Sequence, residues 1–175
     1  MTDPEKRPGQ IILGWWSETL GRRETGVQRG LAARLRRGDA IAVLCEGEVH
    51  DLGRELGLVQ GAEAARRLVR LARVLAQVRE HVGAVLPRQL GAGAPPAMSK
   101  ARFEKLIRAE GDELEAALRR ALPVVNDRTN VAALGEALLH WTEPTRTRWC
   151  FDYYRTEFTP APSDAAEPTT EDVSQ

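Results

Sequence analysis

One apolar stripe constrains the fold of this chain more than any other feature of its sequence. Its five members recur in steps of 3, 4, 3 and 4 residues: Leu68, Leu71, Leu75, Val78 and Val82. That spacing places the side chains on one face of an α-helix, which we expect over about residues 62–82. No stretch of the sequence shows the sustained alternation of apolar and polar residues that a half-buried β-strand needs. The sequence therefore predicts an all-α fold.

Capping and turn residues predict further helices around the other apolar stretches. Asp39, Ser99 and Asn130 each precede an apolar segment, as helix N-caps do. Pro144 suits the first turn of a helix because its missing N–H costs nothing there. The expected segments lie at about residues 11–20, 26–37, 40–45, 49–56, 62–82, 99–110, 112–122, 131–141 and 143–154. We expect them to pack as a bundle of about eight helices.

The length and composition suit one domain with a core of its own. With 175 residues, 42% of them hydrophobic, the chain can bury a core without a disulfide or a metal. We expect a helical domain over residues 10–159. Residues 1–9 and 160–175 are polar and are predicted to be disordered. Residues 86–98 are rich in Gly and Pro, which predicts a mobile loop and makes it the candidate hinge between two helical halves.

The charges balance overall but not along the chain. The net charge is zero, which argues against a strongly basic nucleic-acid-binding domain. Residues 161–175, however, carry four acids and no basic residue, so the remainder has a net charge of +4. Arginine accounts for 22 of the 25 basic residues. This preference suits bidentate contacts to phosphate, although a GC-rich coding sequence also produces it.

Basic residues in three segments have few acidic neighbours. Segment 21–38 holds six arginines, including Arg29, against one acid. Two columns on later segments recur at helical steps: Arg66, Arg70 and Arg73, and Arg102, Lys105 and Arg108. A solvated helix face is the simpler interpretation of any one of these, but such faces usually interleave opposite charges. Three such segments together favour contact with phosphate. Because base-reading Asn and Gln are scarce on them, we expect contact with the nucleic-acid backbone.

The sequence carries no motif of an enzyme active site. It has no glycine-rich nucleotide loop, no HExxH zinc motif and no GxSxG nucleophile motif. Its three histidines are scattered, and Cys45 and Cys150 form no CxxC pair. We therefore predict a protein without catalysis, cofactor or metal. No apolar run approaches the roughly 20 residues of a membrane span, and no secretory signal is evident, so we expect a soluble, cytoplasmic protein without a membrane partner.

Four stretches, taken in order, resemble one protein family. They are LGWWSETLGRRETGVQRGLAARLRRGD (13–39), MSKARFEKLIRAEG (98–111), LRRALPVVN (118–126) and LLHWTEPTRTRWCFDYY (138–154). Together they resemble the CasB family, the small subunit of the type I-E CRISPR Cascade surveillance complex. The resemblance covers about residues 11–158. It implies an all-α, non-catalytic subunit, present in two copies, that contacts the backbone and large subunits, guide RNA and target DNA and stabilises the R-loop.

The same resemblance implies which basic residues contact nucleic acid. The matching motif positions are Arg36, Arg37, Arg102, Arg108, Arg119, Arg120, Arg146 and Arg148, while Lys105 occupies a variable position. Three other interpretations stay open. One is a protein-interaction adaptor that docks through Trp15, Trp16 and the aromatic last helix. The others are an enzyme whose site assembles only in space and a DNA-binding transcription regulator.

Overall fold

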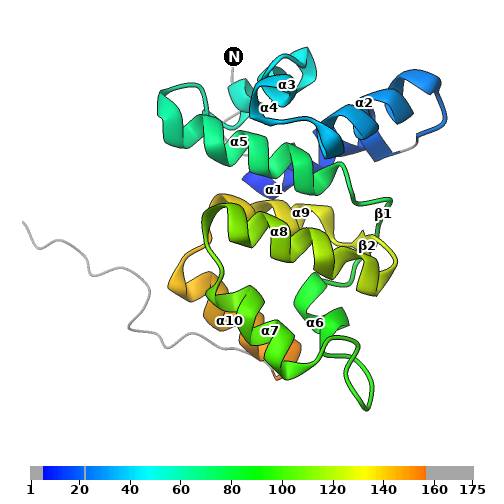
Figure 1. Ribbon diagram of the computed structural model, residues 1–175, viewed down its shortest axis with the longest axis vertical. Helices are drawn as coiled ribbons and strands as arrows, with labels where there is room; N and C mark the ends of the chain where they lie inside the picture. Colours follow the sequence, from blue (N-terminus) through cyan, green and yellow to red (C-terminus); the bar gives the residue numbers. More distant parts are fainter. Residues whose placement is uncertain (1–5, 22, 157–175) are drawn as a thin grey trace, which may run out of the picture.

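The computed structural model describes residues 6–21 and 23–156 and confirms the all-α fold. Ten α-helices lie within those residues (Figure 1): α1 (Pro8–Trp16), α2 (Gly26–Arg37), α3 (Ala40–Leu44), α4 (Gly47–Glu55), α5 (Gly61–Leu75), α6 (Leu86–Leu90), α7 (Lys100–Arg108), α8 (Gly111–Ala121), α9 (Val131–Leu139) and α10 (Glu143–Tyr153). A π-helical turn, Ser17–Gly21, follows α1, and a 3₁₀ turn, Leu122–Val125, follows α8. None of the helices in these ranges is long and apolar enough to span a membrane.

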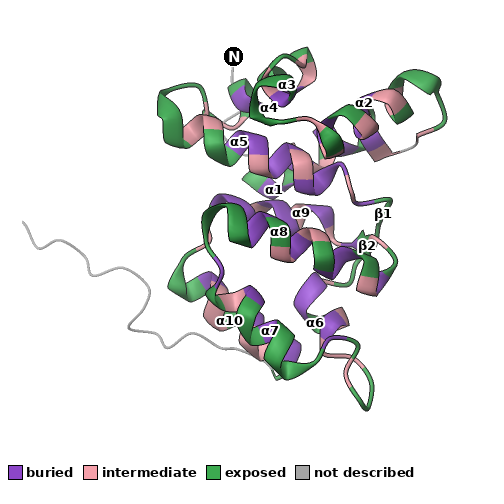
Figure 2. Ribbon diagram, viewed as in Figure 1, coloured by how far each residue is buried: buried purple, intermediate pink, exposed green. Residues whose placement is uncertain are grey.

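The helices stack in three levels along the long axis of the molecule (Figure 1). Helices α2 to α5 form one end, α8 and α9 the middle, and α6, α7 and α10 the other end. The core runs through all three levels, because buried positions on each helix face the neighbouring level (Figure 2). Helix α5 contacts α2, α3 and α4 on one side and α8 and α9 on the other, and α1 packs along α9.

Helices α1 and α9 cross closely because glycines lie at their interface. A Cβ added to Gly135 of α9 would lie 2.7 Å from the Cδ1 and Cγ2 atoms of Ile12 in α1, and Ile12 is fully buried. At the start of α1, the N–H of Gly9 donates a 3.0 Å hydrogen bond to Oε1 of Glu136. The missing side chains at Gly9 and Gly135 therefore allow the two helices to approach each other.

We expect Gly135→Ala to lower the free energy of unfolding by about 1–3 kcal/mol, because the new methyl group must displace Ile12 in a packed core. The matched control is Gly14→Ala in α1, where an added Cβ meets open space. That change should raise stability by about 0.5–1 kcal/mol. Urea unfolding of both variants checks the prediction. Equal effects of the two substitutions would show that the crossing at Gly135 is not tight.

The structure corrects two predicted helix boundaries. Helix α1 begins at Pro8, with Gly9 buried, so these residues do not belong to a disordered N-terminal segment. Helix α5 ends at Leu75 instead of near residue 82. Beyond it, the chain forms a short parallel pair, β1 (Glu80–His81) with β2 (Arg128–Thr129). The predicted disordered tail, residues 160–175, lies outside the described residues, as do residues 1–5.

A half-buried arginine, Arg23, binds backbone carbonyl groups just after the end of α5. Nη2 of Arg23 donates to the carbonyl oxygens of Ala76, at 2.6 Å, and Val78, at 2.9 Å. Such carbonyls have no partner within a helix that is ending. Burial, and then repulsion from Arg36 and Arg79, lowers the pKa of Arg23. This contact explains why the helical hydrogen bonding stops while the apolar spacing of the sequence continues.

The Gly- and Pro-rich segment 86–98 is only partly a loop. Its first residues form α6, in which Leu86 and Leu90 are buried, so the prediction of a loop over the whole segment is wrong. At its far end, the N–H of Met98 donates to the carbonyl of Leu90 at 2.8 Å. The carbonyl of Met98 accepts the hydroxyl of Tyr153 at 2.7 Å. The role of this segment as a hinge stays a prediction.

The predicted caps are confirmed. The side chains of Asp39, Ser99 and Asn130 each accept a hydrogen bond from the N–H three residues further along the chain. Ser99 thereby begins α7. Because the cap fixes where the helix starts, it also fixes which residues of α7 face the core.

Helix α7 packs onto α10 through aromatic contact. Phe103 and Leu106 are buried, as predicted, and Ile107 is half-buried. The Phe103 ring stacks on Tyr153 of α10 with 4.0 Å between ring centroids and 15° between planes. Nε1 of Trp141 donates to the Ala109 carbonyl, just after α7, at 2.9 Å. The other face of α7 is left to solvent.

Candidate nucleic-acid interface

Helix α7 presents three cations on its exposed face. Arg102, Lys105 and Arg108 are all exposed, and within the described residues their side chains form neither an ion pair nor a hydrogen bond. The acid on this helix, Glu104, pairs instead with Lys100, 3.8 Å away. Because the opposite face is anchored in the core, these cations must project into solvent. We call Arg102, Lys105 and Arg108 the α7 ridge.

A second basic feature is a groove between α5 and α8. It consists of two adjoining hollows of about 500 and 540 Å³ that share Arg66, Arg70 and Asp112 in their walls. The groove collects five of the predicted residues from distant parts of the chain: Arg66, Arg70, Arg73, Arg119 and Arg146. We call it the α5–α8 groove.

Acids inside the α5–α8 groove already neutralise some of these arginines. Glu115, which is buried, lies 3.1 Å from Nε of Arg73 and 3.6 Å from Nη1 of Arg119. Among residues 6–21 and 23–156, the Arg73 Nε–H has no hydrogen-bond acceptor, so its contact with Glu115 is an ion pair without hydrogen-bond geometry. The predicted lack of acidic partners along this column is therefore wrong for Arg73.

The mouth of the groove holds a second acid. Glu63 pairs with Arg66 at 3.1 Å and with Arg67 at 3.3 Å. These hydrogen bonds, first that from Arg66 and then that from Arg67, lower the pKa of Glu63. Arg66 is thus paired, contrary to prediction. Arg70 differs, because its Nε is buried without a hydrogen-bond partner among the described residues.

Four of the predicted residues, two of which also line the groove, make contacts that stabilise the fold. Nη2 of Arg119 donates to the carbonyl of Arg36 at 2.7 Å, which ties α8 to the end of α2. Arg36 itself donates through Nε to a carbonyl within α2, at 3.3 Å. Arg29 donates to two carbonyls of the loop before α2, at 3.1 and 3.2 Å. Nη2 of Arg146 donates to Oε1 of Glu110 at 2.6 Å. These guanidinium groups hold the backbone or an acid in place.

Three remaining predicted residues are exposed and scattered. Arg37 ends α2, Arg120 lies in the last turn of α8, and Arg148 lies on α10. None of the three side chains has an ion-pair or hydrogen-bond partner in the part of the chain that the structure describes. They are free to contact an anion, and they lie on three different helices, none of which is α7.

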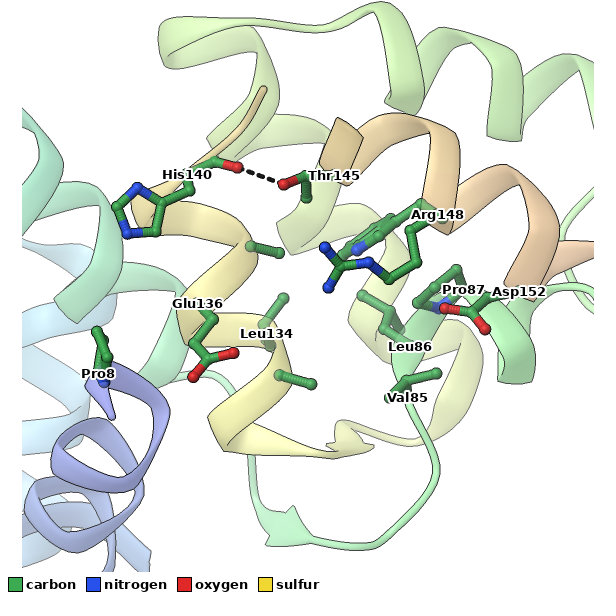
Figure 3. Close-up of a pocket in the computed structure, with 13 residues that line it drawn as sticks. Pro8, Val85, Leu86, Pro87, Leu134, Glu136, His140, Thr145, Arg148 and Asp152 are labelled. Carbon is green, nitrogen blue, oxygen red and sulfur yellow. Dashed lines mark hydrogen bonds between the residues drawn. The ribbon is translucent and has the colours of Figure 1, made fainter. Parts of the chain in front are cut away.

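Arg148 lies beside a smaller hollow of about 290 Å³ between α6, α9 and α10 (Figure 3). Glu136, His140 and Asp152 also line it, but Glu136 is already engaged by Gly9. Nothing in this hollow pairs a nucleophile with a base. Across residues 6–21 and 23–156, no group of three or more His, Cys, Asp or Glu side chains could hold a metal ion.

Sequence reasoning missed Arg67, which lines the α5–α8 groove beside Arg66. The available signal was its position four residues after Glu63 on the same helix, where opposite charges meet. The pairing of Arg73 with Glu115 had no such signal, because 42 residues separate them in the sequence. Only the packing of α8 against α5 brings these two side chains together.

Four of the aromatic residues that an adaptor would use belong to the core, whereas Tyr154, at the end of α10, is 60% exposed. Trp15 is 6% exposed and Trp16 is 4% exposed. Their Nε1 atoms donate to the carbonyls of Glu48, at 2.8 Å, and Leu75, at 3.1 Å. In the last helix Trp149 is also buried. These side chains hold helices together and are not displayed for a partner.

The fold and the surface together define a small all-α protein with an arginine-lined groove and an exposed cationic helix. The family model for the CRISPR-associated protein Cse2 matches residues 31–154. The chain therefore belongs to the Cse2 family, also called CasB, of the type I-E CRISPR Cascade complex, as the resemblance predicted.

A solved structure shares this fold. The crystal structure of CasB from Thermus thermophilus superposes with a TM-score of 0.67 at 23% sequence identity, covering 86% of this chain and 100% of that one. No curated protein sequence matches the chain. At this level of identity the comparison establishes the common fold, while the chemistry of the surface must be read from this chain's own residues.

Proposed function

We propose that this protein is a non-catalytic subunit of Cascade that binds nucleic-acid backbone through the α7 ridge and stabilises the R-loop. The observation that carries the proposal is the row of three exposed cations on α7 that have no ion-pair partner among the described residues. Like charges at helical spacing repel one another. A phosphate chain placed along the ridge removes that repulsion and releases its own counterions.

The chemistry of the ridge suits phosphate better than base edges. Arg102, Lys105 and Arg108 are cationic donors, and α7 carries neither Asn nor Gln. Contacts to phosphate fix position on a strand without reading its sequence. The ridge is therefore suited to guide RNA or to the displaced strand of target DNA, whatever its sequence.

The α5–α8 groove supports a second, weaker contact. Its acids compensate several of its arginines, but the buried Nε of Arg70 lacks an acceptor in the part of the chain that the structure describes. An anion that entered the groove would supply one. Because Glu63, Glu110 and Glu115 oppose it, we assign the groove a supporting role and the ridge the main one.

Weak contacts to the nucleic-acid backbone are sufficient for the proposed role. R-loop formation exchanges one duplex for another of similar stability, so modest contacts to a strand can shift the balance. The partners we propose are the backbone and large subunits of Cascade, guide RNA, target DNA and a second copy of this chain. Residues beyond the ridge that suit such contacts are the exposed Arg37, Arg120 and Arg148.

The salt dependence of binding tests the proposal. We expect the isolated protein to bind a labelled single-stranded oligonucleotide irrespective of its sequence. Its affinity should fall with salt at a log–log slope of about −0.7 per phosphate contacted. Fluorescence anisotropy at several salt concentrations measures the slope. Affinity that stays flat between low and physiological salt would contradict phosphate contact and favour the adaptor instead.

A further inference from the structure

The positive charge of the folded part of this chain is offset by its last 19 residues. Residues 157–175 contain five acids and no basic residue: Glu157, Asp164, Glu167, Glu171 and Asp172. The whole chain has 25 basic and 25 acidic residues, so residues 1–156 hold 25 basic against 20 acidic. The excess of five cations in residues 1–156 thus equals the number of acids in the segment that follows.

The described chain ends beside α7. Tyr153 stacks on Phe103, which lies on the buried face of α7, opposite the ridge. The N–H of Thr156 then donates to the Phe151 carbonyl at 2.9 Å, which holds the last described residue against the end of α10. The segment that follows therefore starts beside α7.

The lengths allow this segment to reach the whole ridge. The nine residues of α7 make a helix about 14 Å long. Eight residues lead from Thr156 to Asp164, and they span up to about 26–29 Å when extended. Asp164 and the three later acids can thus reach any of the three ridge cations.

We propose that the acidic segment after Thr156 docks on the α7 ridge of its own chain and competes there with nucleic acid. The α5–α8 groove is a poorer acceptor for it, because Glu63, Glu110 and Glu115 already pair with arginines there. The ridge has no such pairs among the described residues. The competition, though not the docking itself, rests on the proposed function.

The two ligands of the ridge differ in how they bind. The segment is tethered, so its effective concentration at the ridge is on the order of millimolar, but its few carboxylates are screened over about 10 Å at 0.1 M salt. A long nucleic acid offers phosphates to several exposed cations at once. The segment therefore excludes short or transient nucleic acids and yields to a strand held in place by the assembled complex.

The test uses the full chain with Asp164→Asn, Glu167→Gln, Glu171→Gln and Asp172→Asn combined. If the segment occupies the ridge half of the time or more, this variant binds labelled oligothymidylate at least about twofold more tightly than wild type at low salt. The difference should vanish at high salt. The matched control is the full chain with four exposed acids neutralised around α1 and α4: Glu18→Gln, Glu24→Gln, Asp51→Asn and Glu55→Gln.

A second measurement separates the docking from the proposed function. Amide NMR spectra should change for residues 100–108 in the tail variant and stay unchanged there in the control. Unchanged amide shifts on α7, or equal tightening of DNA binding in the two variants, would overturn the inference. Changed α7 shifts with no DNA binding by any form of the protein would support docking and refute the proposed function.

Discussion

Full-length protein with Arg102→Glu and Arg108→Glu is expected to bind single-stranded DNA at least about tenfold more weakly per substituted residue at about 0.1 M salt. Each reversal removes one attraction to phosphate and adds one repulsion. The log–log salt slope should also become less steep by about 0.7 per lost contact. Both side chains are exposed and unpaired among the described residues, so each change should alter stability by no more than about 0.5 kcal/mol.

The control for net charge reverses two exposed arginines elsewhere, Arg7→Glu with Arg54→Glu. It lowers the charge of the chain by the same amount without touching α7. Anisotropy titrations and thermal melts on both double variants provide the measurements. If the control weakens binding as much as the ridge variant, long-range charge and not the ridge governs binding. If the ridge variant melts early while its folded fraction binds normally, the α7 cations are structural.

Much of the α7 region was predictable because its determinants are local. Ser99 caps the helix through an N–H three residues away, and the spacing of Phe103 and Leu106 fixes the buried face. Once that face is set, the direction of Arg102, Lys105 and Arg108 follows from helix geometry. The caps at Asp39 and Asn130 were predictable for the same reason, because each joins residues only three positions apart.

The α5–α8 groove was not predictable from the sequence because its determinants are distant. After Glu63, which pairs with Arg66, α5 carries no acid that could compensate Arg70 or Arg73. Only packing brings Glu115 of α8 within 3.1 Å of Arg73. Local spacing therefore overestimates free positive charge wherever two helices are in contact, whereas it holds for α7, whose outer face no described helix covers.

The predicted end of α5 was wrong for a similar reason. The apolar stripe continues to Val78, which is buried, although the helix stops at Leu75. Burial can continue in a turn when another group takes the released carbonyls, and Arg23 does so from a position 53 residues earlier. Periodicity thus identified four buried residues of the stripe, although Val82 is only half-buried, and it did not identify the conformation at Val78.

Phe103→Ala is expected to lower the free energy of unfolding by about 3–5 kcal/mol, because it removes a large buried ring and leaves a cavity. Phe103 is 3% exposed and stacks on Tyr153. Through this pair α7 is attached to α10, so the surrounding chain cannot close the cavity without moving the helix. Urea unfolding gives the magnitude, and Ile107→Ala, at a half-buried position of the same helix, is the matched control with a smaller expected loss.

Phe103→Ala also tests whether stability and nucleic-acid binding depend on different residues of α7. Phe103 does not reach the exposed face, so whatever fraction of Phe103→Ala remains folded should bind oligonucleotide with nearly the wild-type salt slope. The ridge variant should show the reverse, with a normal melt and a reduced slope. If Phe103→Ala stays as stable as wild type, the stacking contributes little and α7 is held chiefly by Leu106 and the Trp141 bond to Ala109. The position of the ridge would then depend on those contacts, and Leu106→Ala would be the substitution that displaces it.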